Sequence, residues 1–271
     1  MLTQIKGLID ERTAQLQCLS GNQIKIIAVV CMFIDHLCAV IINSIFSWCG
    51  NKGIFTWEEI SLFSDKSNNI LYSIGAVAFP LFCFLLVEGY THTRSKKKYI
   101  CRLALFALIS EIPFDITFFN QFAKSNNTYP LYWGYQNVMV TYLLGICTLA
   151  LIDYLQRVEP KVLRMFLQCG SVLAIVLLAE EIIHCDYEGY GVFLIVLFYI
   201  LRKSRIAQVG GVLLLATMRY TQYPVALLAA LLLILLYNGK RGIHHNKYFF
   251  YMFYPAHMVL LHILDMVITY V

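Results

Sequence analysis

The chain has 271 residues, of which 59% are hydrophobic and only 14% are charged, and its mean hydropathy is +0.67. Soluble domains keep about a quarter of their residues charged, so this composition excludes an ordinary soluble domain and indicates a membrane protein. The bilayer interior offers no water to the backbone, and apolar runs of about 20 residues are therefore expected to be helices. We predict an all-α fold, a polytopic integral membrane bundle of about nine to ten transmembrane helices.

Residues 1–23 precede the first long apolar run. Their apolar side chains recur at near-helical spacing, which predicts an amphipathic cytosolic segment on the membrane surface. Charged residues at 10–12 interrupt any apolar stretch typical of a cleaved signal peptide. Ser20 or Asn22 is suited to cap the first span. Residues 24–271 are expected to form a single transmembrane domain.

The remaining chain alternates apolar runs with short polar clusters, and each run is a predicted span. The nine runs are 24–46, 70–90, 99–119, 137–155, 163–183, 189–201, 206–218, 223–237 and 248–270. The sixth and seventh are short, because a helix of 13 residues rises only about 20 Å. These two either extend into their polar flanks or are broken helices buried inside the bundle.

The distribution of Lys and Arg predicts the orientation, because these residues collect on the cytoplasmic side. With the N-terminus in the cytosol, only Lys52, Lys66, Lys124 and Arg219 of the 21 basic residues fall on the outer side. The net charge of +5 is explained by this bias and predicts no nucleic-acid partner. Membrane lipid is the expected surrounding partner.

Two ionisable residues, Asp35 and His36, lie deep in the first run, about 12 residues and roughly 18 Å along the predicted helix. A charge at the centre of a membrane helix costs about 2.5 to 3.5 kcal/mol, so the pair is expected to face the bundle interior. Consecutive helical residues point about 100° apart, and the two are expected to have separate partners. Because a neutral imidazole is suited to accept a proton from an amine or hydroxyl, His36 is our candidate general base. The alternative is a structural histidine.

The third run ends in Ser110-Glu111-Ile112-Pro113-Phe114-Asp115. Glu111 and Asp115 are four residues apart on one helical face, where two ionised carboxylates would repel. One of them is therefore expected to be protonated, or to have a cation or a hydrogen-bond donor nearby. The alternative is an interfacial helix end whose acids face water.

Further polar residues are expected at the same level of the membrane. Gln136 and Asn137 open the fourth span, and Asp186 and Glu188 precede the sixth. Arg219 follows the seventh span, and Tyr254 and His257 lie beside a proline in the last. Each alone is typical of a loop, a cap or helix packing. Together they predict a polar cavity, which is the candidate substrate-binding site.

A basic cluster closes the second span and comprises Arg94, Lys96, Lys97 and Lys98. It is either a site for an anionic cofactor or the consequence of the positive-inside rule. The nine cysteines are scattered without a CxxC pair and predict no metal site. Cys49 and Cys185 are expected on the same side of the membrane, where they either pair or remain free.

Several of these segments, in this order, resemble the TraX family over most of residues 20–265. They are Ile34-Asp35-His36, Ala78-Phe79-Pro80-Leu81-Phe82 with Glu88-Gly89, Ser110 to Asp115, Gln136-Asn137-Val138 with Thr141 and Gly145, Gly189-Tyr190-Gly191-Val192, and Phe253-Tyr254-Pro255 with His257. The resemblance implies a bacterial cytoplasmic-membrane acetyltransferase, in a family named for the pilin N-acetylase. It also implies cytosolic acetyl-CoA as co-substrate and a histidine of an early span as base.

On this hypothesis the chain transfers acetyl from acetyl-CoA to an amine or hydroxyl of a peptide, sugar or lipid, without a metal. His36 is the general base, with Asp35 beside it, while Glu111 and Asp115 help to position the acceptor and to polarise the thioester carbonyl. The chain departs from the family pattern at Gly75-Ala76-Val77, where an Arg is often found, and at Cys38, where a Gly is often found. The competing hypothesis is a proton-coupled transporter or channel with a buried Asp/Glu/His relay.

Overall fold

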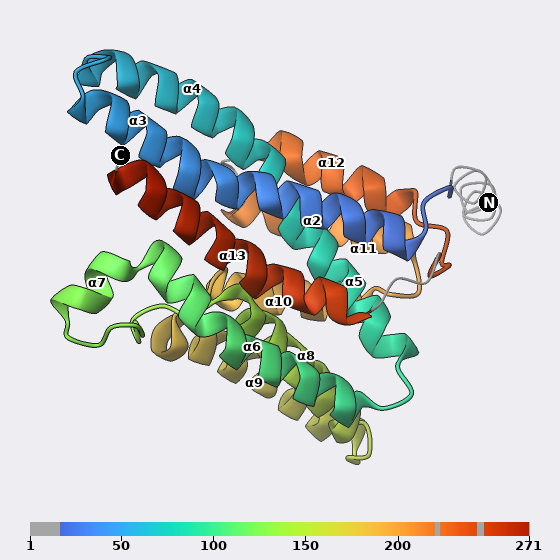
Figure 1. Cartoon of the computed structure of the whole chain (residues 1–271). Helices are drawn as coiled ribbons and strands as arrows, with labels where there is room; N and C mark the ends of the chain where they lie inside the picture. Colours follow the sequence, from blue (N-terminus) through green and yellow to red (C-terminus); the bar gives the residue numbers. More distant parts are fainter. Residues whose placement is uncertain (1–16, 220–222, 243–246, 271) are drawn as a thin grey trace.

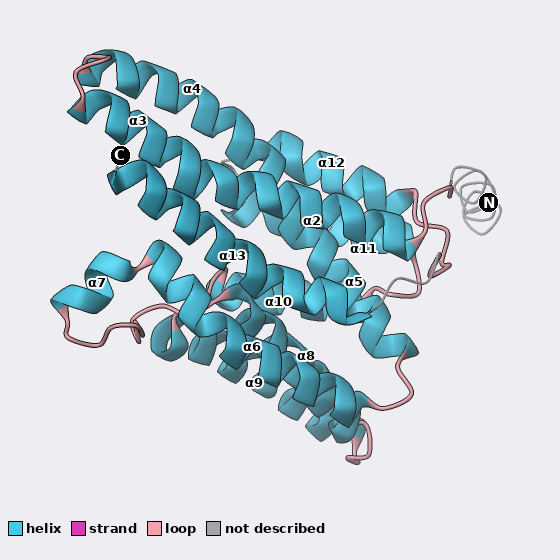
Figure 2. Ribbon diagram, in the orientation of Figure 1, coloured by secondary structure: helices cyan, strands magenta, loops and turns pink. Residues whose placement is uncertain are grey.

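The computed structural model describes residues 17–219, 223–242 and 247–270. Within these ranges the chain is helical, and its only extended pairings are two isolated bridges, Leu19 with Tyr237 and Gln136 with Cys185. Figure 2 shows helices joined by loops throughout the described part. Most of the predicted amphipathic segment, residues 1–16, lies outside the described residues.

The helices of the bundle follow the chain as labelled in Figure 1. They are α2 (Gly21–Leu37), a π-helical segment (Cys38–Ile42), α3 (Asn43–Asn51), α4 (Trp57–Gly75), α5 (Ala78–His92), α6 (Lys96–Phe118), α7 (Asn120–Ser125), α8 (Val138–Leu155), α9 (Lys161–Leu178), a second π-helical segment (Ala179–Ile183), α10 (Glu188–Ile200), α11 (Arg205–Arg219), α12 (Pro224–Leu235) and α13 (Lys247–Tyr270).

Each of the nine predicted runs coincides with a helix or with a continuous helical stretch. Five stretches are long and apolar enough to cross a membrane by length and composition: Gly21–Asn51, Trp57–His92, Val138–Leu155, Lys161–Ile183 and Tyr248–Tyr270. The apolar helices α10, α11 and α12 are shorter, and α6 is long but carries more charge. The chain is therefore a membrane helical bundle, while the count of nine to ten spans and the cytosolic N-terminus stay predictions.

Helix α2 begins at the N-cap Ser20, one of the two predicted caps. Ser20 Oγ accepts a hydrogen bond from Gln23 N, and Gln23 Oε1 accepts from Ser20 N, so the two residues form a capping box. The stretch from α2 to α3 then has 31 residues, which corresponds to about 46 Å of helix against about 30 Å of hydrocarbon. The α3–α4 hairpin accordingly extends the bundle at the end far from the start of α2 (Figure 1).

The short helix α10 lies in the interior of the bundle and packs on α5, α8 and α9. Nine of its 13 residues are buried. A Cβ added at Gly145 of α8 would lie 2.4 Å from Ile195, and one at Gly191 would lie 2.5 Å from Thr141, so these glycines permit close helix contact. The sixth predicted run is thus a short helix buried inside the bundle, the second of the two alternatives.

One end of the bundle collects basic side chains and is here called the basic end. It contains the start of α2, α6, α9, α11 and α13 and the end of α5, α8, α10 and α12, with Arg94, Lys96, Arg157, Arg202 and Lys240 among its residues. The loop after α12 closes on α2, where Gly21 N donates to Lys240 O at 2.9 Å and Asn22 N donates to Arg241 O at 3.0 Å. At the opposite end Cys49 and Cys185 are both free and unpaired, as are the other cysteines.

Candidate functional site

Two histidines from opposite ends of the sequence meet inside the bundle. His36 Nδ1 of α2 lies 2.6 Å from His257 Nε2 of α13, and the two rings are parallel within 3°. His257 is 4% exposed, and its other ring nitrogen, Nδ1, donates to Phe253 O at 2.7 Å. The imidazole of His36, predicted to face the interior, therefore has a specific partner 221 residues away.

Aromatic rings enclose this histidine pair. Phe118 lies edge-on to His36 with ring centroids 5.3 Å apart, and Tyr254 is 6.2 Å from His36 and 5.9 Å from His257. Phe253 stacks on His257 at 4.9 Å. Such a lining has a low dielectric constant, in which hydrogen bonds and charges interact more strongly than in water.

Asp35 does not join the histidine pair. Its side chain lies against α4, where a Cβ added at Gly75 would come within 2.2 Å of Asp35 Oδ1. Asp35 and His36 thus face different helices, α4 and α13. Gly75 belongs to the segment where the family pattern often has an Arg, and in the described part of the chain no basic side chain forms an ion pair with Asp35.

Asn137 and Glu111 form a second polar cluster. Asn137 is fully buried at the start of α8, where its Oδ1 accepts from Met139 N at 2.9 Å and caps the helix. Its Nδ2 donates to Ala107 O at 3.0 Å and to Glu111 Oε2. Asn137 therefore supplies the hydrogen-bond donor that the sequence predicts near the carboxylate pair.

Asp115 lies one turn beyond Glu111 and, like Asn137, is fully buried. Its Oδ2 accepts from Tyr132 N at 2.7 Å. The remaining oxygens, Glu111 Oε1 and Asp115 Oδ1, are buried and have no hydrogen-bond partner among the described residues. Burying two carboxylate oxygens without hydrogen-bond donors costs folding free energy, so these oxygens are the expected binding points for a ligand that donates hydrogen bonds.

Asp186 lies in the loop before α10, next to the same cluster. Tyr135 OH donates to Asp186 Oδ1 at 3.2 Å, and Asp186 O accepts from Thr141 Oγ1. Burial raises the pKa of the Asp186 carboxyl to about 6, although the Tyr135 hydroxyl opposes the shift. The pKa of the Tyr135 phenol is also raised, chiefly by burial and then by the neighbouring Asp186 charge.

The other predicted acceptor-site residues have more peripheral positions. Gln136 is half-buried and its Nε2 donates to Trp133 O at 3.1 Å. Glu188 begins α10 beside Asp186, with a left-handed φ of 47°. Arg219 is the last residue of α11, and its side chain lies outside what the structure describes. Among the described residues, no group of three or more His, Cys, Asp or Glu side chains is arranged to hold a metal ion.

A cavity of about 520 Å³ runs from the basic end toward the histidine pair. It lies between α2, α5, α6, α8 and α13, and its volume is typical of a small-molecule site. At the basic end its lining includes Gly21, Thr93 and Arg241, and at its deep end Met32, Val138 and Tyr254. The face of α2 that lines it carries Lys25, Val29 and Met32, and the same face continues one turn later to His36.

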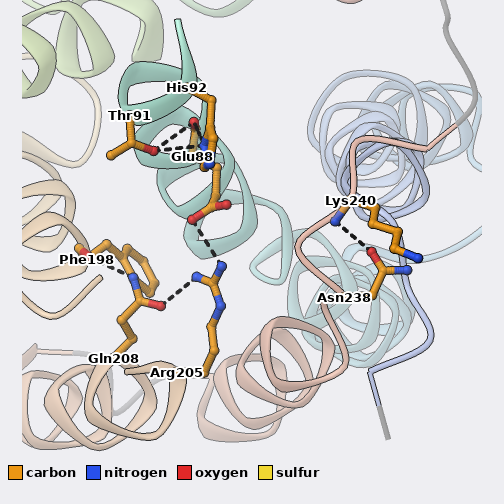
Figure 3. A network of polar contacts seen from close by, with 8 residues as sticks. All are labelled: Glu88, Thr91, His92, Phe198, Arg205, Gln208, Asn238 and Lys240. Carbon is orange, nitrogen blue, oxygen red and sulfur yellow. Dashed lines mark hydrogen bonds and ion pairs between the residues drawn. The ribbon is translucent and has the colours of Figure 1, made fainter. Parts of the chain in front are cut away.

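The basic residues of this cavity are Lys25, Arg102 and Arg241. Arg102 Nε is buried and has no hydrogen-bond partner in the described part of the chain. The acidic residue of the lining, Glu88, is already paired, because Arg205 Nη2 donates to its Oε1 at 3.1 Å (Figure 3). The cavity wall therefore has uncompensated positive charge, which suits an anionic ligand.

Figure 3 also shows how Arg205 is held in place beside Glu88. Its Nη1 donates to Gln208 Oε1 at 2.9 Å, and Gln208 Nε2 donates to Phe198 O at 2.7 Å. The guanidinium lies over the ring of Phe84 at 4.7 Å. With its partners satisfied inside the bundle, Arg205 serves to neutralise Glu88 and does not line the cavity.

The cluster predicted to bind an anionic cofactor lies at the same end but outside this cavity. Lys96 Nζ forms an ion pair with Asp153, and Arg94, Lys97 and Lys98 are exposed. None of these four residues lines the cavity. Sequence reasoning missed Lys25, Arg102 and Arg241, although the spacing of Lys25, Val29, Met32 and His36 on one helical face was a usable signal.

Comparisons with known proteins agree with the resemblance seen in the motifs. The model of the family described as TraX protein matches residues 20–265. The probable fimbrial assembly protein FimC, serogroup H1, of Dichelobacter nodosus is 30% identical over 261 residues, which cover 89% of this chain and 94% of that protein. No solved structure matches the chain. The family match extends over nearly the whole described bundle and includes both histidines, so the chain belongs to the TraX family.

Proposed function

We propose that the chain is a membrane-embedded acetyltransferase that uses acetyl-CoA and His36 to acetylate an amine. The observation that carries the proposal is the position of the cavity, which begins among basic side chains and ends at Tyr254, in contact with the His36–His257 pair. A base beside the deep end of a cavity with a basic lining suits transfer from a phosphorylated donor.

The basic end of the cavity is the proposed donor site. Coenzyme A carries its phosphates at one end and supplies a reactive thioester at the other. Lys25, Arg102 and Arg241 would hold the phosphates, and Arg102 Nε offers a buried donor that lacks a protein partner. The apolar lining beyond them, including Val29 and Met32, leads along α2 to His36.

The carboxylate cluster is the proposed acceptor site. Glu111 Oε1 and Asp115 Oδ1 are buried oxygens that accept no hydrogen bond from a described residue, and Asp186 lies nearby with Tyr135. A primary amine brings several N–H donors and a positive charge in its protonated form, whereas a hydroxyl brings one donor and no charge. This difference favours an amine. Since the similar Dichelobacter protein is named a probable fimbrial assembly protein, the proposed acceptor is the amine of a fimbrial subunit.

The chemistry assigned to the protein is proton transfer at one nitrogen of His36. A protonated amine first gives one proton to a carboxylate of the acceptor site, because only the neutral amine has a lone pair for attack. As the neutral acceptor nitrogen then bonds to the acetyl carbon, His36 takes the second proton, and it returns this proton to the sulfur when the carbon–sulfur bond breaks. The aromatic enclosure of Phe118 and Tyr254 excludes water and thereby limits hydrolysis of the thioester. With the predicted orientation, the donor enters from the cytosol of a bacterial cell and the chain resides in the cytoplasmic membrane.

The test is acetyl transfer by purified protein in liposomes, with radiolabelled acetyl-CoA and two peptides of one sequence, the first with a free N-terminus and the second with a blocked one. We expect label only on the free peptide, and we expect His36→Ala to lower the rate by about 10²- to 10⁴-fold while the protein remains folded. His262→Ala is the matched control, because His262 lies on α13 like His257 but outside the pair and the cavity.

Full transfer by His36→Ala would overturn the assignment of the base. Equal labelling of a hydroxyl acceptor would overturn the preference for amines. If the wild type transfers no acetyl but moves protons across the liposome membrane, the alternative of a proton-coupled transporter replaces the proposal.

A further inference from the structure

Two hydrogen bonds in series determine where the protons of the histidine pair reside. Phe253 O can only accept, so His257 Nδ1, which lies 2.7 Å away, carries a proton. In a neutral imidazole the other nitrogen is then an unprotonated acceptor. His36 Nδ1 lies 2.6 Å from this nitrogen, His257 Nε2, and must therefore be the donor. The protonation of both rings follows from one backbone carbonyl.

The remaining nitrogen of the pair is His36 Nε2. It carries the lone pair, and no protein donor contacts it within the described part of the chain. The parallel rings and the packing of Phe33 at 6.1 Å from His257 hold the two imidazoles in one orientation. In water the neutral imidazole of histidine prefers its proton on Nε2, so this arrangement imposes the less common tautomer on both rings.

We infer that His257 is a positioning residue that fixes the tautomer of His36 and thereby makes His36 Nε2 the basic nitrogen; the inference rests on the proposed acetyl transfer. With the opposite tautomer, His36 would present an N–H group and could not accept a proton. The role is that of the orienting member in base dyads and triads, here filled by a second histidine instead of a carboxylate.

The pair also accommodates the proton that His36 gains. When Nε2 takes the acceptor proton, the pair carries one positive charge and His36 has a proton on each nitrogen. The Nδ1 proton of His36 can then move to His257 Nε2, while His257 Nδ1 keeps its own proton and continues to donate to Phe253 O. The positive charge is thus shared between the two rings. When the shared proton returns to His36 Nδ1 and the Nε2 proton passes to the leaving sulfur, both rings are neutral again.

The first experiment reads the tautomers without any activity. In protein labelled with ¹⁵N-histidine and reconstituted in nanodiscs, we expect the signals of His36 and His257 to show neutral rings protonated on Nδ1, assigned by their loss in His36→Ala and His257→Gln. A neutral His36 protonated on Nε2 would overturn the inference. This result is independent of substrate, so it stands or falls separately from the proposed acetyl transfer.

The second experiment is kinetic. His257→Leu removes the acceptor and is expected to lower kcat on the order of 10²- to 10⁴-fold. His257→Gln retains an oxygen that can accept from His36 Nδ1 and is expected to recover part of kcat, with a shifted pH profile. His262→Leu, on the same helix, controls for the loss of an imidazole. A purely structural His257 would lower thermal stability in His257→Leu and leave kcat and its pH profile unchanged, and that outcome would overturn the inference.

Discussion

Replacing Arg102 by Gln tests whether the cavity is the donor site. Arg102 lines the cavity and its Nε is buried without a protein partner, so a bound phosphate would complete its hydrogen bonds. A hydrogen bond to a charged group contributes about 1.5 to 3 kcal/mol. Since about 1.4 kcal/mol corresponds to a factor of ten, the KM for acetyl-CoA should rise about 10- to 100-fold. We expect a smaller change in kcat, because the lost contact serves binding in the ground and transition states alike.

The assay measures initial rates of transfer to the free-amine peptide over a range of acetyl-CoA concentrations. Lys203→Gln is the control, because Lys203 is an exposed cation at the basic end and outside the cavity. Lys97→Gln and Lys98→Gln separate the two hypotheses for the donor site, since sequence reasoning assigned it to their cluster. An unchanged KM in Arg102→Gln together with a raised KM in the lysine variants would refute the cavity as the donor site.

Two further predictions concern stability, measured by thermal unfolding in detergent. Burial raises the pKa of Asp186 to about 6 from an ordinary 3.8, so the folded state binds the proton more tightly than the unfolded state, and the stability of the fold falls as the pH rises from about 4 to about 6. At pH 8, Asp186→Asn should therefore unfold at a higher temperature than the wild type. A gain of the same size at pH 4 would contradict the reasoning. Asn137→Ala removes a helix cap and leaves Ala107 O and Glu111 Oε2 without their donor, which should cost about 2 to 4 kcal/mol, whereas the half-buried Gln136→Ala should cost no more than about 0.5 kcal/mol.

The positions of most helices followed from the sequence because each span is a local property, although residues 57–69 of α4 and the short α7 lie outside the predicted runs. An apolar run satisfies its backbone within itself, so hydropathy alone places a helix wherever about 20 apolar residues occur together. Ser20 was one of the two caps predicted for α2, and its partner in the structure, Gln23, is only three residues away. The collection of basic residues at one end also follows from composition along the chain.

The partners within the site were not determined by local sequence. The depth of Asp35 and His36 indicated that both face the interior, but His257 as the partner of His36 depends on how α2 and α13 are rotated and tilted against each other. That geometry is set by packing contacts such as the approach of Asp35 to Gly75 on a third helix. The residues at such contacts are distant in sequence, so no periodicity records them.

The basic lining of the cavity likewise depends partly on local sequence and partly on tertiary packing. Sequence alone identified an excess of positive charge at one end of the bundle, because the count of Lys and Arg is local information. Only the tertiary structure decided that Lys96 is paired with Asp153, that Glu88 is neutralised by Arg205, and that Arg102 lines the cavity and has a buried Nε without a protein partner. The physical reason is that a charge acquires its role from its neighbours in space, and helix packing brings together residues that the chain keeps apart.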